Sequence, residues 1–387
     1  MDERDKAEQD FKKQFNDYDQ TVDVVSCWHF LSDTIFKKSY FFRFGKFRTK
    51  DNAELTPDFA VAESKDGNEG DPGCIVCDVK KLPNPHPDST DVAQREAAYK
   101  IFGKKIEEVF KYGTGLTYAS DFDGLPKLAF TKHEVVLLTP EETVDSAYKY
   151  LEAKLGPKRF DVGRPLVLVS YVYSGSDQLE CYMFKWKQGQ LNSPFSHPIL
   201  ADRMVAKNQP IKVFPKHFLE YKVRHIVCND PPPTIYLIVY IWVEVLMKFL
   251  TPEEIELWQS IGSTRTREIE LTVQQLHRKL CDEYSAPFGM RDVRRALDTL
   301  CEIKRAVLKD KGKELYAIQF YNLASRGRKA EPGEQDGVPD RERQREYGRI
   351  FAQLLAKKEV APLPTRRRIG FRRSKANPNY PMLPFPE

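Results

Sequence analysis

The sequence lacks a hydrophobic run that would cross a bilayer comfortably. Its most apolar stretch, Thr234–Leu250, contains Glu244 and Lys248 and is rich in aromatic residues, whereas a membrane helix needs about 20 consecutive, mostly apolar residues. We therefore expect a buried helix of a soluble domain and no membrane association. The chain is charged from its second residue, so its N-terminus does not predict a signal peptide.

Cysteine is sparse and irregularly spaced. The seven cysteines are an odd number without a repeating pattern, which predicts reduced thiols and a cytoplasmic protein. Cys74 and Cys77 have the spacing of half a zinc site, but residues three apart in a strand face opposite sides. No second pair completes the site, so the sequence does not predict a zinc protein.

The sequence also lacks a strong excess of either positive or negative charge. The formal net charge is +5 over 387 residues, too small to establish nucleic-acid binding by itself but compatible with it if the positive charge is clustered. The length admits two or three domains, each with its own core.

Two short apolar segments, 56–61 and 75–81, carry the strongest functional signal. The first contains Asp58 after a proline, and the second contains Asp78 and Lys80 two residues apart. We expect both segments to be strands, with a hairpin between them. Because side chains alternate along a strand, Asp78 and Lys80 share a face. Charged groups beside an apolar strand are costly to bury unless something compensates them, and a divalent cation would.

This arrangement resembles the PD-(D/E)xK nuclease superfamily, which has the restriction endonuclease-like fold. There, a proline-aspartate pair on one strand is followed by a hairpin and by acid-x-lysine on the next strand, and Pro57, Asp58, Asp78 and Lys80 match those positions. The resemblance implies that Asp58 and Asp78 bind Mg²⁺, with Mn²⁺ as an alternative, and that Lys80 orients or helps deprotonate a water. The competing interpretation is two unrelated strands with solvated charges.

A helix is expected to follow the second strand, over Asp91–Tyr112, with Asp91 as its N-cap. Gln94 and Tyr99 on this segment resemble the glutamine-to-tyrosine helix of RecB-like exonucleases, although their spacing is one residue too long. The resemblance implies a catalytic role for Gln94. An ordinary exposed polar residue is an equally good interpretation.

Residues 1–228 are expected to form one α/β unit around a mixed sheet. Alternating and helical patterns predict, in order, a strand at 132–138, a helix at 140–155 and strands at 164–174 and 178–187. Strand, helix, strand after the acidic motif is the order that an α/β nuclease core needs. A proline triplet ending at Pro233 breaks both helix and sheet and marks a boundary.

Residues 229–323 are expected to be mainly helical, with helices at 234–250, 273–284 and 291–303 and a hairpin at 306–320. This order resembles the winged helix-turn-helix class, which implies that the last helix enters the major groove of DNA. Docking of a partner protein is the other use of such a domain. The residues expected to contact DNA are Arg291, Arg294 and Arg295 on the helix and Lys311 and Lys313 in the hairpin turn.

Residues 324–387 are expected to be a linker and a basic tail, with a short helix at 347–357. The tail suits DNA phosphates or an acidic partner protein equally well. Its basic residues include Arg366, Arg367, Arg368, Arg372 and Arg373.

These features predict a metal-dependent DNA endonuclease. The layout resembles the end-cleaving subunit of heteromeric transposases, which joins such a nuclease core to a C-terminal winged-helix region, and this implies a setting in transposition or phage defence. Cutting both strands with one site per chain usually requires a homodimer or a larger assembly. The alternative is a non-catalytic DNA-binding or scaffolding protein on a nuclease-like fold. A third hypothesis is an RNA-directed nuclease, but the sequence contains no RNA-stacking motif that would favour it.

Overall fold

The computed structural model describes residues 2–35, 39–43, 47–49, 51–63, 74–85, 90–114, 116–118, 129–130, 133–156, 160–176, 179–189, 204, 207–222, 225–226, 231–254, 267–284, 288–320 and 341–359. The chain divides into two compact units. The sheet unit comprises Asp17–Pro232 and Asp336–Pro339, and the helical unit comprises Met1–Asn16, Pro233–Gln335 and Asp340–Glu387. Helix α1 (Glu3–Ile35) contributes residues to both.

The sheet unit is built on a seven-stranded mixed sheet. The strand order is β1-β4-β5-β8-β9-β10-β11. Strand β5 is parallel to β8 and β8 is parallel to β9, while the remaining neighbours are antiparallel. The strands are β1 Ser39–Phe42, β4 Phe59–Glu63, β5 Cys74–Val79, β8 His133–Pro140, β9 Leu166–Ser176, β10 Leu179–Gln188 and β11 Ile211–Val213.

A second, smaller sheet in this unit has four short strands in the order β3-β2-β6-β7. They are β2 Phe47–Thr49, β3 Glu54–Leu55, β6 Leu116–Tyr118 and β7 Ala129–Phe130.

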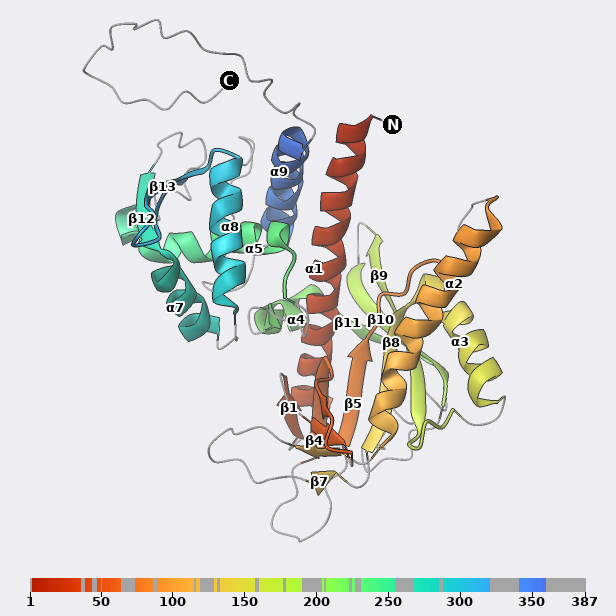
Figure 1. Ribbon diagram of the computed structural model, residues 1–387. Coiled ribbons are helices and arrows are strands. Elements are labelled where there is room, and N and C mark those ends of the chain that lie inside the picture. The colour runs from red at the N-terminus through yellow and green to blue at the C-terminus, as the bar shows by residue number, and fades with distance from the viewer. Residues whose placement is uncertain are drawn as a thin grey trace, which may run out of the picture. The chain divides into compact units, whose positions relative to one another are not determined.

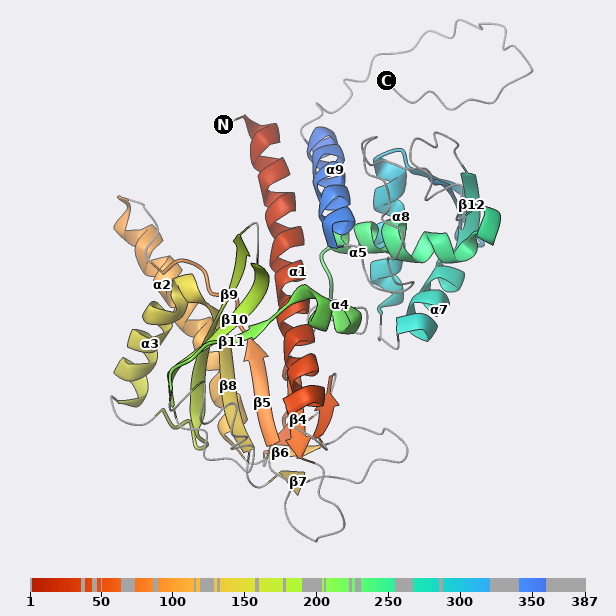
Figure 2. The same ribbon diagram turned by 180° about the vertical axis from the view of Figure 1, so that it is seen from behind.

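Helices cover both faces of the large sheet (Figure 1, Figure 2). Helix α2 (Val92–Glu107), extended by the 3-10 turn η1 (Glu108–Gly113), and helix α3 (Glu141–Leu155) lie on one face. The two helices make the crossovers that parallel strands require, from β5 to β8 and from β8 to β9. Their apolar sides meet alternate strand residues in a core that includes Phe102, Ile106, Ala147, Leu151, Val76, Val135, Leu137 and Leu168.

The opposite face is covered by α1, from Asp17 onward, and by helix α4 (Pro215–Lys222). Trp28 of α1 packs against Phe59 and Phe184, with ring centroids 6.0 and 5.8 Å apart. Because β4 and β10 present these rings on the face that α2 and α3 do not cover, the sheet is buried on both sides. Strands buried on both sides contain continuous apolar runs, as β8 does from Val135 to Leu138.

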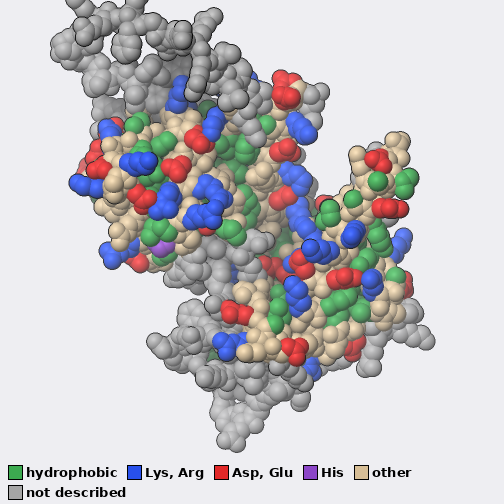
Figure 3. Space-filling view, in the orientation of Figure 1, with side chains coloured by type: hydrophobic (Ala, Val, Ile, Leu, Met, Phe, Trp, Pro, Cys, Tyr) green, Lys and Arg blue, Asp and Glu red, His purple; other side chains and the backbone are tan. Residues whose placement is uncertain are grey.

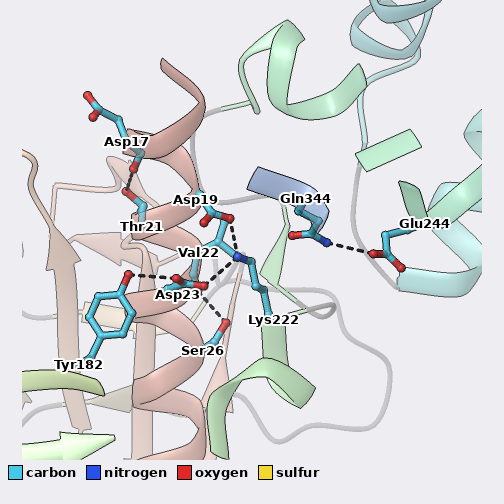
Figure 4. A network of polar contacts seen from close by, with 10 residues as sticks. All are labelled: Asp17, Asp19, Thr21, Val22, Asp23, Ser26, Tyr182, Lys222, Glu244 and Gln344. Atoms are coloured by element: carbon cyan, nitrogen blue, oxygen red, sulfur yellow. Dashed lines mark hydrogen bonds and ion pairs between the residues drawn. The ribbon is translucent and has the colours of Figure 1, made fainter. Parts of the chain in front are cut away.

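A buried ionic network joins α4 to α1 (Figure 4). Lys222 Nζ forms ion pairs with Asp19 and, at 2.9 Å, with Asp23 Oδ1, and all three side chains are at most 5% exposed. The Tyr182 hydroxyl donates to Asp23 Oδ2 at 3.0 Å. Buried charges are tolerated when they are paired and hydrogen-bonded, and this network fixes which face of α4 lies against α1.

The helical unit contains a three-stranded antiparallel sheet in the order β12-β14-β13. Its helices include the first turns of α1, whose Phe15 packs on Tyr236 with centroids 5.1 Å apart. The elements after Pro233 are α5 Thr234–Tyr240, continued by a π turn Ile241–Val245 and a 3-10 turn Leu246–Phe249, then β12 Arg267–Thr272, α7 Val273–Tyr284, α8 Met290–Glu302, β13 Ala306–Asp310, β14 Leu315–Phe320 and α9 Arg341–Glu359.

The mixed α/β class expected from the sequence is confirmed, and the helix expected at 234–250 is present and buried along most of its length. Within the part of the chain that the structure describes, no helix is both long and apolar enough to span a bilayer. Strand β12 was not expected. Its apolar content is only Ile269 and Leu271, and its pairing with β14, distant in sequence, defines it.

Candidate active site

Asp58 and Asp78 meet where β4 begins and β5 ends. Asp58 directly precedes β4, Asp78 is the next-to-last residue of β5, and the antiparallel register pairs their neighbours Phe59 and Cys77. The Val79 amide donates to Asp58 Oδ2 at 2.7 Å. The two carboxyl groups are within hydrogen-bonding distance of each other, and the residues are only 9% and 3% exposed. The strand register therefore builds a buried carboxylate pair.

The environment of Asp58 disfavours its charged form. Burial, followed by the nearby charge of Asp78, raises the pKa of Asp58 well above its usual range. The hydrogen bond from Val79 acts in the opposite direction but is outweighed. Desolvation and a like charge are the two conditions that make a carboxyl hold its proton. An additional positive charge would favour the ionised form of Asp58.

Lys80 follows β5 and lies beside this pair. Its Nζ is 3.1 Å from Asp78 Oδ2 and 2.8 Å from Glu108 Oε2. Burial by itself would lower the pKa of Lys80, but the charge of Asp78 and the hydrogen bonds that Lys80 donates to both acids outweigh it, so the pKa is raised. Asp78 and Lys80 thus share a face, as strand alternation predicts, and the lysine is a fixed cation.

Glu108 is the site residue that sequence reasoning missed. It lies at the start of η1, 28 residues after Lys80. Burial raises the pKa of Glu108, but Lys80 together with Lys111 and Lys105 outweighs it, so the pKa is lowered. The preceding Glu107 is engaged elsewhere, with Lys154 at 2.9 Å and with the Tyr150 hydroxyl at 2.7 Å. No local pattern distinguishes the two glutamates, because only the rotation of the helix on its core decides which one reaches Lys80.

Two buried tyrosines line the same region. Burial, with the charges of Asp78 and Asp58, raises the pKa of Tyr112. Burial also raises the pKa of Tyr171 on β9, with added effects from Glu142 and Asp17. The Tyr171 hydroxyl has no hydrogen-bond partner among the described residues. Both phenols therefore remain protonated; the Tyr112 hydroxyl donates to the Thr56 carbonyl oxygen at 3.4 Å.

The donor set fits a hard divalent cation. Mg²⁺ prefers oxygen ligands, keeps several waters, and is often held by one or two carboxylates together with substrate phosphates. Asp58 and Asp78 supply such a pair, and the raised pKa of Asp58 is the electrostatic conflict that a cation would relieve. Among the described residues, no group of three or more His, Cys, Asp or Glu side chains forms a ready cation site. Waters and phosphate oxygens are the other ligands that such an ion usually takes.

The structure places Gln94 away from this cluster. Gln94 is exposed in the first turn of α2, whereas Glu108 directly follows the last turn of that helix. The 14 residues between them correspond to a rise of roughly 21 Å. The chain leaves β5 through residues 80–91 before α2 begins, so it is the end of the helix that returns to Lys80.

The residues expected to contact DNA in the helical unit lie on α8 and on the β13–β14 turn. Arg291 and Arg295 are exposed, as are Lys311 and Lys313. Arg294 instead donates from Nε to Glu314 Oε1 at 2.6 Å, so its charge is partly compensated. The tail arginines Arg366, Arg367, Arg368, Arg372 and Arg373 lie outside the described residues.

Comparison of the chain with protein-family models, with curated proteins and with solved structures found no match.

Proposed function

We propose that this protein is a metal-dependent endodeoxyribonuclease that hydrolyses phosphodiester bonds. The observation that carries the proposal is the buried contact between Asp58 and Asp78, with Lys80 Nζ 3.1 Å from Asp78. Two carboxylates for a cation and a fixed ammonium beside them are the groups that phosphodiester hydrolysis requires. A site of purely structural use would not need two acids in contact at this burial.

The order of elements supports the same proposal. We infer that the sheet unit has a restriction endonuclease-like core, because an antiparallel β4–β5 pair carries the acids and helices α2 and α3 then cross over to the parallel strands β8 and β9. We infer that the helical unit contains a winged helix, because α5, β12, α7, α8 and the β13–β14 hairpin follow in that class's order.

Asp58 and Asp78 would hold Mg²⁺ or Mn²⁺. When bound, such an ion lowers the pKa of a coordinated water and offsets charge on the phosphate. Lys80 orients the attacking water and stabilises the negative charge that develops on the phosphoryl oxygens. Glu108 holds the Lys80 ammonium in place from the side opposite Asp78.

The reaction balances as a hydrolysis. The water oxygen forms a bond to phosphorus in line with the bond that breaks, and the O3′ leaving group takes up a proton. The products are a 3′-hydroxyl and a 5′-phosphate. The exposed Arg291, Arg295, Lys311 and Lys313 of the helical unit would contact the duplex and position it.

The test is cleavage of supercoiled plasmid in Mg²⁺ or Mn²⁺ and in EDTA. We expect nicked or linear DNA only with metal, and no cleavage by Asp78→Ala or Lys80→Ala. Lys81→Ala is the matched control, since Lys81 pairs with Asp17 and not with the carboxylate pair. Cleavage that survives both site variants would contradict the proposal. If the protein binds DNA without cleaving it, and binding does not depend on Asp58 and Asp78, the result would favour the non-catalytic alternative.

A further inference from the structure

A row of charged side chains follows the outward face of α2 and η1. Lys100, Lys104 and Glu108 succeed one another at intervals of four residues, which places them on one helix face. Lys111 follows Glu108 by three residues, one turn of a 3-10 helix, and so continues the row. We call Lys100, Lys104 and Lys111 the α2 lysine line. The inward face of the same segment carries its buried residues, among them Phe102, Ile106, Val109 and Tyr112.

The α2 lysine line is exposed, and its charge is not neutralised by ion pairs. Within the described part of the chain, none of its three ammonium groups makes a hydrogen bond or an ion pair. Two of the three acids in this segment are already occupied, Glu107 by Lys154 and Glu108 by Lys80. The third, Glu96, precedes Lys100 by one turn. In the space-filling view, basic and acidic side chains both lie over α2 (Figure 3).

The α2 lysine line passes the candidate active site. Glu108, which binds Lys80 at 2.8 Å, stands between Lys104 and Lys111. From the helix rises, the line extends about 6 Å beyond Glu108 on the Lys111 side and about 12 Å on the Lys100 side. Measured along the DNA helix axis, at about 3.4 Å per nucleotide of one strand, the whole line spans roughly five nucleotides. The lysines therefore flank the position where hydrolysis is proposed.

We propose that the α2 lysine line binds the backbone phosphates of a DNA duplex on both sides of the bond to be cut. The inference rests on the proposed function for the position of that bond, but the binding surface itself does not depend on catalysis. Lysine ammonium groups in a row on a rigid helix match a regular line of phosphates. No aromatic side chain stands in the row, so it offers charge to a duplex and no stacking platform for unpaired bases.

The test measures binding of a fluorescein-labelled 20-bp duplex to the full chain by anisotropy across a salt series. Ca²⁺ replaces Mg²⁺ so that binding is measured without relying on cleavage. The variant combines Lys100→Ala, Lys104→Ala and Lys111→Ala. A matched control combines Lys149→Ala, Lys212→Ala and Lys216→Ala, which removes equal charge from exposed positions of α3, β11 and α4. A labelled RNA hairpin serves as the competing polyanion.

Each lysine bound to a phosphate contributes about one unit to the slope of log K against log salt. We expect the α2 variant to lose about three units of slope. With equal affinities at 1 M salt, this loss corresponds to binding that is on the order of several hundredfold weaker at 0.1 M salt, while the control matches wild type. Equal slopes for the α2 variant and wild type would overturn the inference, as would wild-type binding to RNA but not to duplex DNA. If the expected loss of slope is seen but wild type never cuts plasmid in Mg²⁺, the hydrolysis proposal fails and the binding surface stands.

Discussion

Asp58 is buried against a second carboxylate, and its protonated form is therefore favoured in the folded protein. A group whose pKa is raised on folding contributes stability below its unfolded pKa, and that contribution is lost as the pH rises through the folded pKa. We expect Asp58→Asn to raise the Tm in EDTA at pH 8 by about 3 °C and to lose this advantage near pH 4. Thermal unfolding followed by circular dichroism measures it. A lower Tm for the variant at pH 8 would contradict this electrostatic description.

Glu108 and Glu107 are adjacent, yet only Glu108 contacts Lys80. A hydrogen bond between charged groups contributes about 1.5–3 kcal/mol. Weakening the bond between Lys80 and Glu108 should therefore leave the Lys80 ammonium less firmly positioned for the reaction. We expect Glu108→Gln to lower kcat by about tenfold with KM nearly unchanged, which corresponds to about 1.4 kcal/mol. Glu107→Gln is the matched control and should retain wild-type kcat. An equal loss in both variants would show that Glu108 supports the helix and does not position Lys80.

At the scale of elements, local patterns predicted much of the sheet unit. The strand expected at 132–138 corresponds to β8, whose central run from Val135 to Leu138 is apolar, and Asp91 does cap α2 by accepting from the Ala93 amide at 2.9 Å. The spacing of two residues was sufficient to predict that Asp78 and Lys80 lie on the same face of the strand. What spacing could not supply was the rotation of α2, because burial of Ile106 and Val109 against the sheet decides where Glu108 points. Gln94 shows the same limit, since its distance from the site depends on where the helix starts.

The packing of α4 on α1 involves one buried positive charge, the ammonium group of Lys222. Removing one partner of a buried ionic network leaves uncompensated charge and costs about 3–5 kcal/mol, so Lys222→Met should lower the free energy of unfolding of the sheet unit by that amount. Lys216→Met, on the exposed side of the same helix, should change it by less than about 0.5 kcal/mol. Urea unfolding of both variants is the measurement. A stable Lys222→Met protein would show that apolar packing, such as Phe218 on Tyr182, is sufficient.

At the scale of the whole molecule, α1 links the two units through one continuous helix. Its residue Phe15 is 2% exposed and lies in the helical unit, where it contacts Tyr236 and the α9 residue Gly348, at which an added Cβ would come within 2.9 Å of the ring. Phe15→Ala should destabilise that unit by about 3–5 kcal/mol. Hydrogen exchange should then accelerate in α5 and α9 and stay unchanged in β5 and β8. Acceleration in β5 and β8 as well would mean that the units unfold together.

The most direct measurement of the central claim is the single-turnover rate of duplex cleavage by wild type and by Asp78→Asn in Mg²⁺, with DNA affinity measured in parallel. The substitution keeps the shape of the side chain and removes the charge that faces Lys80 and Asp58. We predict metal-dependent cleavage by wild type, with 5′-phosphate ends, and loss of cleavage in the variant at unchanged affinity for the duplex. Cleavage by Asp78→Asn at the wild-type rate would contradict the assignment of this buried carboxylate pair as the active site.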